Sequence, residues 1–118
     1  MSFSDLALDH IARPRNRGEM PDADRNGQSG SPGEGPYVQI WLKLDGERIA
    51  AASYETNGCP SSVACASMVC ELAKEREMRR LVGLEPKDLI TVLGGLPEGK
   101  EMYASLAVGA LRNALEDK

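Results

Sequence analysis

The chain has 118 residues, of which 42% are hydrophobic and only 4% aromatic, so we expect a single domain over residues 1–118 with a mostly aliphatic core. A formal net charge of −4 argues against broad binding to nucleic acid or to anionic membranes. No stretch approaches the ~20 apolar residues of a membrane span, and we find no secretion signal. Three cysteines, an odd number, favour a reduced cytoplasmic setting over a disulfide framework.

The first predicted element is a helix over residues 2–13. Ser2 and Asp5 are typical of a helix start, and Pro14 is typical of a stop. Helical spacing gives this segment one apolar face, made of Phe3, Leu6, Ala7, His10 and Ile11. Residues 18–36 are rich in Gly, Asp, Asn and Pro, which predicts a long loop with room for one short strand.

A hairpin follows the loop. Residues 37–44 alternate between apolar and polar side chains, as in a half-buried strand, and residues 48–56 are predicted to return beside them. Asp45 and Gly46 between them are a strong signal for a two-residue turn. The sequence thus places its strands before most of its helices.

Three helices are expected after the hairpin, over residues 61–76 or beyond, 86–93 and 100–116. The charged residues between 71 and 80 resemble the solvated face of the first of these helices, with spaced ion pairs. The apolar stripe of the last helix is predicted to contain Tyr103, Leu106, Ala107, Ala110, Leu111 and Ala114. We therefore predict the α+β class, with a small antiparallel sheet of about three strands and helices packed on one face.

The most informative segment is the corner at Gly58 and Cys59, where a strand runs directly into a helix. The free N–H groups and the positive dipole end of that helix favour an anion, so the thiolate of Cys59 should form more readily than an ordinary one. A thiolate is the form that binds metal or attacks sulfur. The alternative is that Cys59 serves as a small apolar packing residue, and the two interpretations are evenly balanced.

Cys65 and Cys70 lie on the predicted helix that follows. Spacings of five and six residues do not match the Cys-x-x-Cys pattern of zinc or redox pairs, so we interpret both as buried packing residues. The alternative makes Cys65 a resolving thiol for oxidised Cys59, which would require the helix to fray.

Several segments resemble one known family, the NifU/IscU-type iron–sulfur cluster assembly scaffold proteins. The run Asp9-His10 to Gly18 is similar to the family's opening Asp-His-x-x-x-Pro-Arg-Asn-x-Gly, and Tyr54 to Ser62 resembles its Phe-x-x-x-Gly-Cys-x-Ser block. Residues 30–35 stand where the family has a Gly-x-Pro-x-Cys-Gly-Asp loop, and residues 105–111 resemble its last helix. The resemblance covers essentially the whole chain and implies an IscU/NifU-like fold. The family also has a histidine at His10 outside its metal set, which implies an orienting or packing role.

The family's ligand positions are mostly substituted in this chain. The resemblance implies a site of three cysteines, an aspartate and often a histidine. At these positions the chain has Glu34, Cys59 and Tyr103 for the cysteines, Pro36 for the aspartate and Met102 for the histidine. Cys59 is retained, and Glu34 could add a carboxylate ligand, its alternative being an exposed loop residue. We do not expect Pro36, Met102 or Tyr103 to ligate.

The resemblance implies a role in iron–sulfur cluster assembly, with sulfur or iron passing through Cys59, and a protein partner that is a cysteine desulfurase or another iron–sulfur assembly protein. An iron–sulfur cluster, zinc or iron is the implied ligand, and binding by the isolated monomer is expected to be weak or absent, because such clusters normally take four thiolate-type ligands. Two alternatives are a non-catalytic partner-binding module that keeps the scaffold fold, and a single-thiol redox protein. Without a nucleophile–base pair, a phosphate loop or paired acids, we expect no enzymatic activity.

Overall fold

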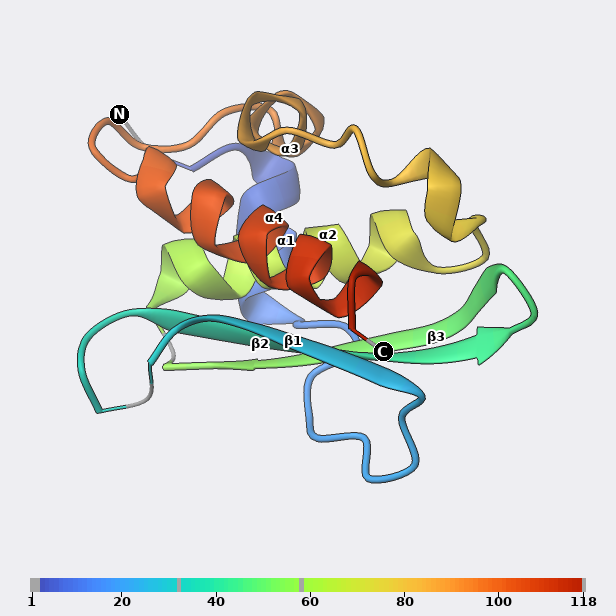
Figure 1. The fold of residues 1–118 in the computed structure, drawn as a ribbon. Helices are drawn as coiled ribbons and strands as arrows, with labels where there is room; N and C mark the ends of the chain where they lie inside the picture. Colours follow the sequence, from blue (N-terminus) through green and yellow to red (C-terminus); the bar gives the residue numbers. More distant parts are fainter. Residues whose placement is uncertain (1–2, 32, 58, 118) are drawn as a thin grey trace.

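The computed structural model describes residues 3–31, 33–57 and 59–117. Three strands form one antiparallel sheet in the order β1-β2-β3, and within the described residues four α-helices all lie on one face of it (Figure 1). In chain order the elements are α1 (Asp5–Ala12), β1 (Arg25–Gly30), β2 (Tyr37–Asp45), β3 (Arg48–Thr56), α2 (Pro60–Ala73), the short 3-10 helix η1 (Met78–Arg80), α3 (Pro86–Leu93) and α4 (Glu101–Leu115). This architecture confirms the predicted α+β class.

The hairpin of β2 and β3 supplies the floor of the core. Val38, Ile40 and Leu42 alternate along β2 and are completely buried beneath the helices, as the period of two in the sequence predicts. The two residues between the strands are Gly46 and Glu47, one position later than the turn predicted at Asp45 and Gly46. Gly46 takes a φ of +64°, a value that glycine adopts without steric cost.

Helix α2 occupies the centre of the molecule. It contacts α1, α3 and α4 as well as β2 and β3, so it is enclosed on every side. Every residue from 61 to 70 is buried, and most of these side chains are small, among them Ser61, Ser62, Ala64, Cys65 and Ala66. Small side chains let the surrounding elements approach this helix closely. No helix in the described part of the chain is both long and apolar enough to cross a membrane.

Helix α1 is shorter than the sequence predicts. It begins at Asp5, and the hydroxyl of Ser4 caps it by accepting a hydrogen bond of 3.0 Å from the backbone N–H of Ala7. Ser2, the predicted start signal, lies outside the described residues. Leu6 was expected on the buried face but is 41% exposed, because α1 contacts the core along a narrower stripe.

His10 is buried at the contact between α1 and α2, where its Nδ1 lies 2.7 Å from the hydroxyl oxygen of Ser67. Burial lowers the pKa of His10, with a further contribution from the positive charge of Arg15. This placement confirms the packing role expected for the chain's only histidine.

The prediction of one helix over residues 61–76 or beyond is wrong at its C-terminal end. Helix α2 stops at Ala73, and Glu75 takes a left-handed φ of +68°. The next residues leave the helix axis and pair with the end of the hairpin: the N–H of Glu75 donates to the carbonyl of Ile49 at 2.7 Å, and the N–H of Ile49 donates to that of Arg76 at 2.9 Å. Residues 75 and 76 therefore pair with β3 through their backbone, where the sequence predicted a further turn of charged helix.

Helix α4 lies directly on β1, at a place where two backbones come unusually close. A Cβ atom built on Gly27 would lie 2.1 Å from the backbone nitrogen of Ala114 and 2.5 Å from the carbonyl oxygen of Ala110. Both neighbours are backbone atoms, which cannot swing aside as a side chain can. Helix α4 can therefore pack this closely on β1 only because Gly27 has no side chain.

The opposite face of the sheet carries polar side chains and Trp41, the chain's only tryptophan. Trp41 lies on β2 between its cross-strand partners Asn26 and Ser53, and it is half-buried. The described helices all cover the other face, so this ring belongs to the outer surface of the sheet (Figure 1).

We expect Gly27→Ala to lower the free energy of unfolding by about 1–3 kcal/mol or more, the usual cost of forcing an extra methyl group into a closely packed site. Gly83→Ala is the matched control, since no heavy atom lies within 4 Å of the Cβ position there and its φ is not positive. Urea denaturation followed by circular dichroism compares the two variants with the parent. Equal stability of Gly27→Ala and Gly83→Ala would contradict the close approach of α4 and β1.

Candidate functional site

The candidate site is built around Cys59, which directly precedes α2 and serves as its N-cap residue. Pro60 takes the first helical position, where the missing N–H of proline costs nothing. The carbonyl of Cys59 accepts hydrogen bonds from the Ser62 hydroxyl at 2.8 Å and from the Val63 N–H at 2.9 Å, which fix the start of the helix. The thiol is half-buried, in contrast to the fully buried Cys65 and Cys70. Gly58, the other half of the predicted corner, lies outside the described residues.

The surroundings of Cys59 favour its thiolate. Burial raises the pKa of this thiol, but the backbone N–H groups of Ser62 and Ser61 at the helix start act in the opposite direction. The hydroxyl of Tyr103 and the positive charge of Lys100 also lower it. The net result is a pKa below the ordinary 9.0 of a thiol. The sequence prediction of an anion-favouring corner therefore agrees with the structure.

Tyr103, which the resemblance places at one of the family's cysteine positions, affects Cys59 through its hydroxyl. The Cys59 sulfur raises the pKa of Tyr103 while the Tyr103 hydroxyl lowers the pKa of Cys59, so the phenol is the protonated partner beside the thiolate. Lys100 lies above the same ring, with its Nζ 5.8 Å from the ring centroid. A protonated phenol therefore stands beside the Cys59 thiol, and the ammonium group of Lys100 adds a positive charge nearby.

The other two thiols are packing residues, as predicted. Burial raises the pKa of Cys65 to about 12, and it raises the pKa of Cys70 further. Both side chains lie within α2 at 0% exposure. Neither forms an appreciable amount of thiolate near neutral pH, which leaves Cys59 as the reactive thiol of the chain.

The comparison with known proteins identifies the family. A family model described as the NifU-like N terminal domain matches residues 2–117. The iron–sulfur cluster assembly scaffold protein IscU 1 of Archaeoglobus fulgidus is 36% identical over 115 residues, which make up 98% of this chain and 75% of that protein. The scaffold protein IscU of Escherichia coli K12 is 31% identical, with 99% of this chain and 94% of that protein covered. The chain belongs to the NifU-like family.

Solved structures share the fold at lower sequence identity. The N-terminal part of a NifU-like protein from Brucella abortus gives a TM-score of 0.72 at 14% identity, covering 96% of this chain and 91% of that one. A putative iron–sulfur cluster assembly scaffold protein from Fervidobacterium islandicum gives 0.69 at 16% identity, covering 96% of each chain. These similarities confirm the IscU/NifU-like architecture.

The other positions that the resemblance assigns to the ligand set are Glu34, Pro36 and Met102. Glu34 is exposed in a turn, and its loop is tied to the Cys59 corner through a hydrogen bond of 3.5 Å from the Asn57 side chain to the carbonyl of Gly35. Pro36 is half-buried and Met102 is 50% exposed. Among the described residues no group of three or more His, Cys, Asp or Glu side chains is placed to hold a metal ion. Ligation by Glu34 stays a prediction.

The sequence pointed to Cys59 and, through the resemblance, to the position of Tyr103, but it missed that Tyr103 and Lys100 lower the pKa of this thiol. The sequence did contain one indication of the Lys100 contribution: Lys100 stands three residues before Tyr103, one turn away at the start of the last helix. Only the seating of α4 against α2 brings that turn beside the thiol.

We expect Cys59 to be alkylated by iodoacetamide faster than Cys65 and Cys70 at neutral pH, because only its pKa is lowered.

Tyr103→Phe removes a donor to the thiolate, so the Cys59 pKa rises and alkylation at pH 7 slows about two- to ten-fold, the factor for one hydrogen bond of about 0.5–1.5 kcal/mol. Mass spectrometry of partially alkylated protein measures the rate at each site across pH. Prior alkylation of Cys65, or an unchanged rate in Tyr103→Phe, would refute this site.

Proposed function

We propose that this protein takes part in iron–sulfur cluster assembly as a sulfur carrier, with Cys59 as the acceptor. The observation that carries the proposal is the contrast among the three thiols: one is half-exposed with a lowered pKa, and two are buried with raised ones. The names of the relatives, which are cluster assembly scaffold proteins, support the pathway. The protein acts here as a carrier and not as an enzyme.

The transfer step requires a partner that presents a cysteine persulfide, for which a cysteine desulfurase is the matching class. The Cys59 thiolate attacks the outer sulfur of that persulfide, and a new sulfur–sulfur bond forms on Cys59. The bond between the two sulfurs of the partner breaks, and the partner's cysteine leaves as a thiolate. One neutral sulfur atom moves between the proteins, so no external oxidant or reductant is needed.

The residues around Cys59 assist this step in separate ways. The helix N–H groups and the Tyr103 hydroxyl stabilise the attacking thiolate, and they would stabilise the persulfide anion that replaces it. Lys100 adds positive charge on the same side. The site is open on one side, because Cys59 is half-exposed and Met102 beside Tyr103 is 50% exposed.

A cluster is the cargo of the family, and the donors of this chain do not fit one. Fe–S clusters are normally held by four cysteine thiolates, whereas Cys59 is the one reactive thiol among the described residues. Tyr103, in a former ligand position, retains its proton. No step of the proposal therefore passes through a cluster held by this chain alone, and iron reaches the sulfur on another protein or between two chains.

The poor fit between the donors of this chain and a cluster also favours a second candidate. This candidate is a regulatory module that keeps the scaffold fold and binds a partner without accepting sulfur. In that case Cys59 and Tyr103 would have no role in sulfur transfer, and the surface that binds the partner would carry the function. The two candidates differ in whether sulfur appears on Cys59.

We expect incubation with a cysteine desulfurase and free cysteine, without air, to add one sulfur atom to Cys59. Intact-mass and peptide mass spectrometry locate the added sulfur, with Cys59→Ser as the negative variant and Cys70→Ser as the matched control that keeps acceptance. Tyr103→Phe should accept sulfur more slowly, in parallel with its alkylation rate. Unmodified Cys59 with retained desulfurase binding would replace the carrier role with the regulatory module.

Restoring the missing ligands tests whether Glu34, Pro36 and Tyr103 line one pocket with Cys59. We expect the triple variant Glu34→Cys, Pro36→Asp, Tyr103→Cys to bind zinc, with thiolate ligands at about 2.3 Å, and to melt at a higher temperature when zinc is present. Zinc stoichiometry and thermal denaturation are compared with the parent and with Glu34→Cys alone. If the triple variant folds but binds no more zinc than the parent does, these positions do not share a pocket.

A further inference from the structure

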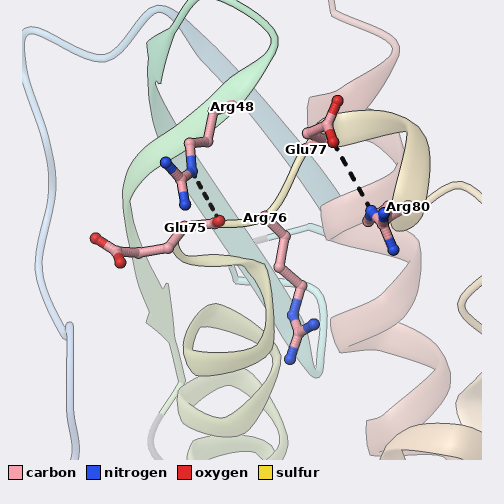
Figure 2. A pocket seen from close by; sticks show the side chains of 5 residues that line it. All are labelled: Arg48, Glu75, Arg76, Glu77 and Arg80. Atoms are coloured by element: carbon pink, nitrogen blue, oxygen red, sulfur yellow. Dashed lines mark hydrogen bonds and ion pairs between the residues drawn. The ribbon is translucent and has the colours of Figure 1, made fainter.

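A groove lies at the opposite end of α2 from Cys59. Its volume is about 500 Å³, and charged side chains line it (Figure 2): Arg48, Glu75, Arg76, Glu77 and Arg80. Helix α2 has 14 residues, so roughly 20 Å of helix separates this groove from the thiol. Nothing in the role proposed for Cys59 uses these side chains.

The backbone that leaves α2 builds the groove. After Ala73 the chain turns through the left-handed Glu75 and pairs with the end of the hairpin, and the N–H of Met78 donates to the carbonyl of Glu47 at 2.9 Å. This pairing places Arg48 of β3 beside residues 75–77 (Figure 2). The arginines therefore project from hydrogen-bonded backbone and not from a loose loop, which reduces the entropy lost when they bind a ligand.

The arginines keep donors available for a ligand. Arg48 uses its Nε to donate to the carbonyl of Glu75 at 2.9 Å, and Arg76 uses its Nε to donate to the carbonyl of Leu72. Within the described residues, no protein group accepts a hydrogen bond from the terminal guanidinium nitrogens of these two arginines. Those nitrogens form the part of the guanidinium that pairs with a carboxylate through two hydrogen bonds.

The glutamates of the groove do not form ion pairs with Arg48 or Arg76, as far as the described residues show. Glu77 forms ion pairs with Arg79 and Arg80 at 3.2 and 3.8 Å. The carboxylate of Glu75 extends away from Arg76 in Figure 2. A chain with a net charge of −4 thus has a local surplus of positive charge here.

A second, mainly apolar hollow adjoins the first. Its volume is about 270 Å³, and it shares Arg76 and Arg80 with the charged groove while Leu72, Leu81, Leu84 and Val92 supply its apolar lining. Val92 of α3 is 42% exposed, and Val82, next to Leu81, is 62% exposed. Val92 thus leaves an exposed aliphatic side chain at the edge of an apolar hollow, a feature typical of surfaces that contact another protein.

We propose that this two-part groove binds a short segment of a partner protein in which acidic and aliphatic residues lie close together. Carboxylates of the segment pair with the terminal nitrogens of Arg48 and Arg76, and an aliphatic side chain enters the hollow beside Val92. A free inorganic anion would use the arginines but not the adjoining apolar hollow, so the joined surfaces favour a peptide. Because the groove lies at the far end of α2, the segment can be bound while Cys59 remains accessible.

The probe is a fluorescein-labelled peptide of alternating Asp and Leu, titrated by fluorescence anisotropy at low and high salt. We expect saturable binding that weakens as salt screens the ion pairs. Arg76→Gln should weaken it about ten-fold, and Val92→Ser should weaken it several-fold by removing apolar contact. Arg13→Gln, which removes one charge from an 81% exposed side chain at the C-cap of α1, is the matched control and should bind as the parent does.

Further comparisons separate the possible occupants. An Asp and Ser peptide should bind much more weakly, a Lys and Leu peptide should not bind, and Cys59→Ser should bind the Asp and Leu peptide normally, which makes this test independent of sulfur transfer. The proposal is overturned by equal binding of the Asp and Ser peptide, which would indicate a plain anion site. It is also overturned by self-association that Arg76→Gln abolishes, or by a failure to bind at millimolar peptide.

Discussion

The complete enclosure of α2 is the constraint on which the rest of the structure depends. Most protein helices bury one stripe, but α2 touches three helices and two strands, so each of its faces must fit a neighbour. Two of its buried serines have hydrogen-bond partners: Ser62 donates to the carbonyl of Cys59, and Ser67 contacts His10 and accepts from the N–H of Arg15. The Cys59 site and the groove of Arg48 and Arg76 lie at opposite ends of this helix, because only at its ends do polar groups reach solvent.

Much of the fold could be predicted from the sequence, because local patterns and tertiary packing agree over most of the chain. The alternation in β2, the position of α3 and the class of the domain all follow from hydrophobic period and from proline. The prediction failed after Ala73, where charged residues at helical spacing continue but the backbone turns away. Pairing with Ile49 outweighs helix propensity there, and Glu75 takes a left-handed conformation that usually signals glycine.

The candidate site was predictable only in part, for a related reason. Cys59 could be recognised because its environment is local: a strand, a turn and the first N–H groups of a helix. Tyr103 and Lys100 come from α4, more than forty residues later, and their effect on the thiol depends on how two helices dock. The resemblance predicts a thiolate ligand at position 103, whereas the phenol there keeps its proton.

The position of Trp41 gives the molecule an optical property of its own. The chain has one tryptophan, and it lies on the outer face of the sheet, away from the described helices. Its indole emission therefore reports on the solvent at that face, without a label and without an engineered residue. A protein that covers the sheet would change this signal directly, whereas chemistry at the sulfur would reach it only through the body of the fold.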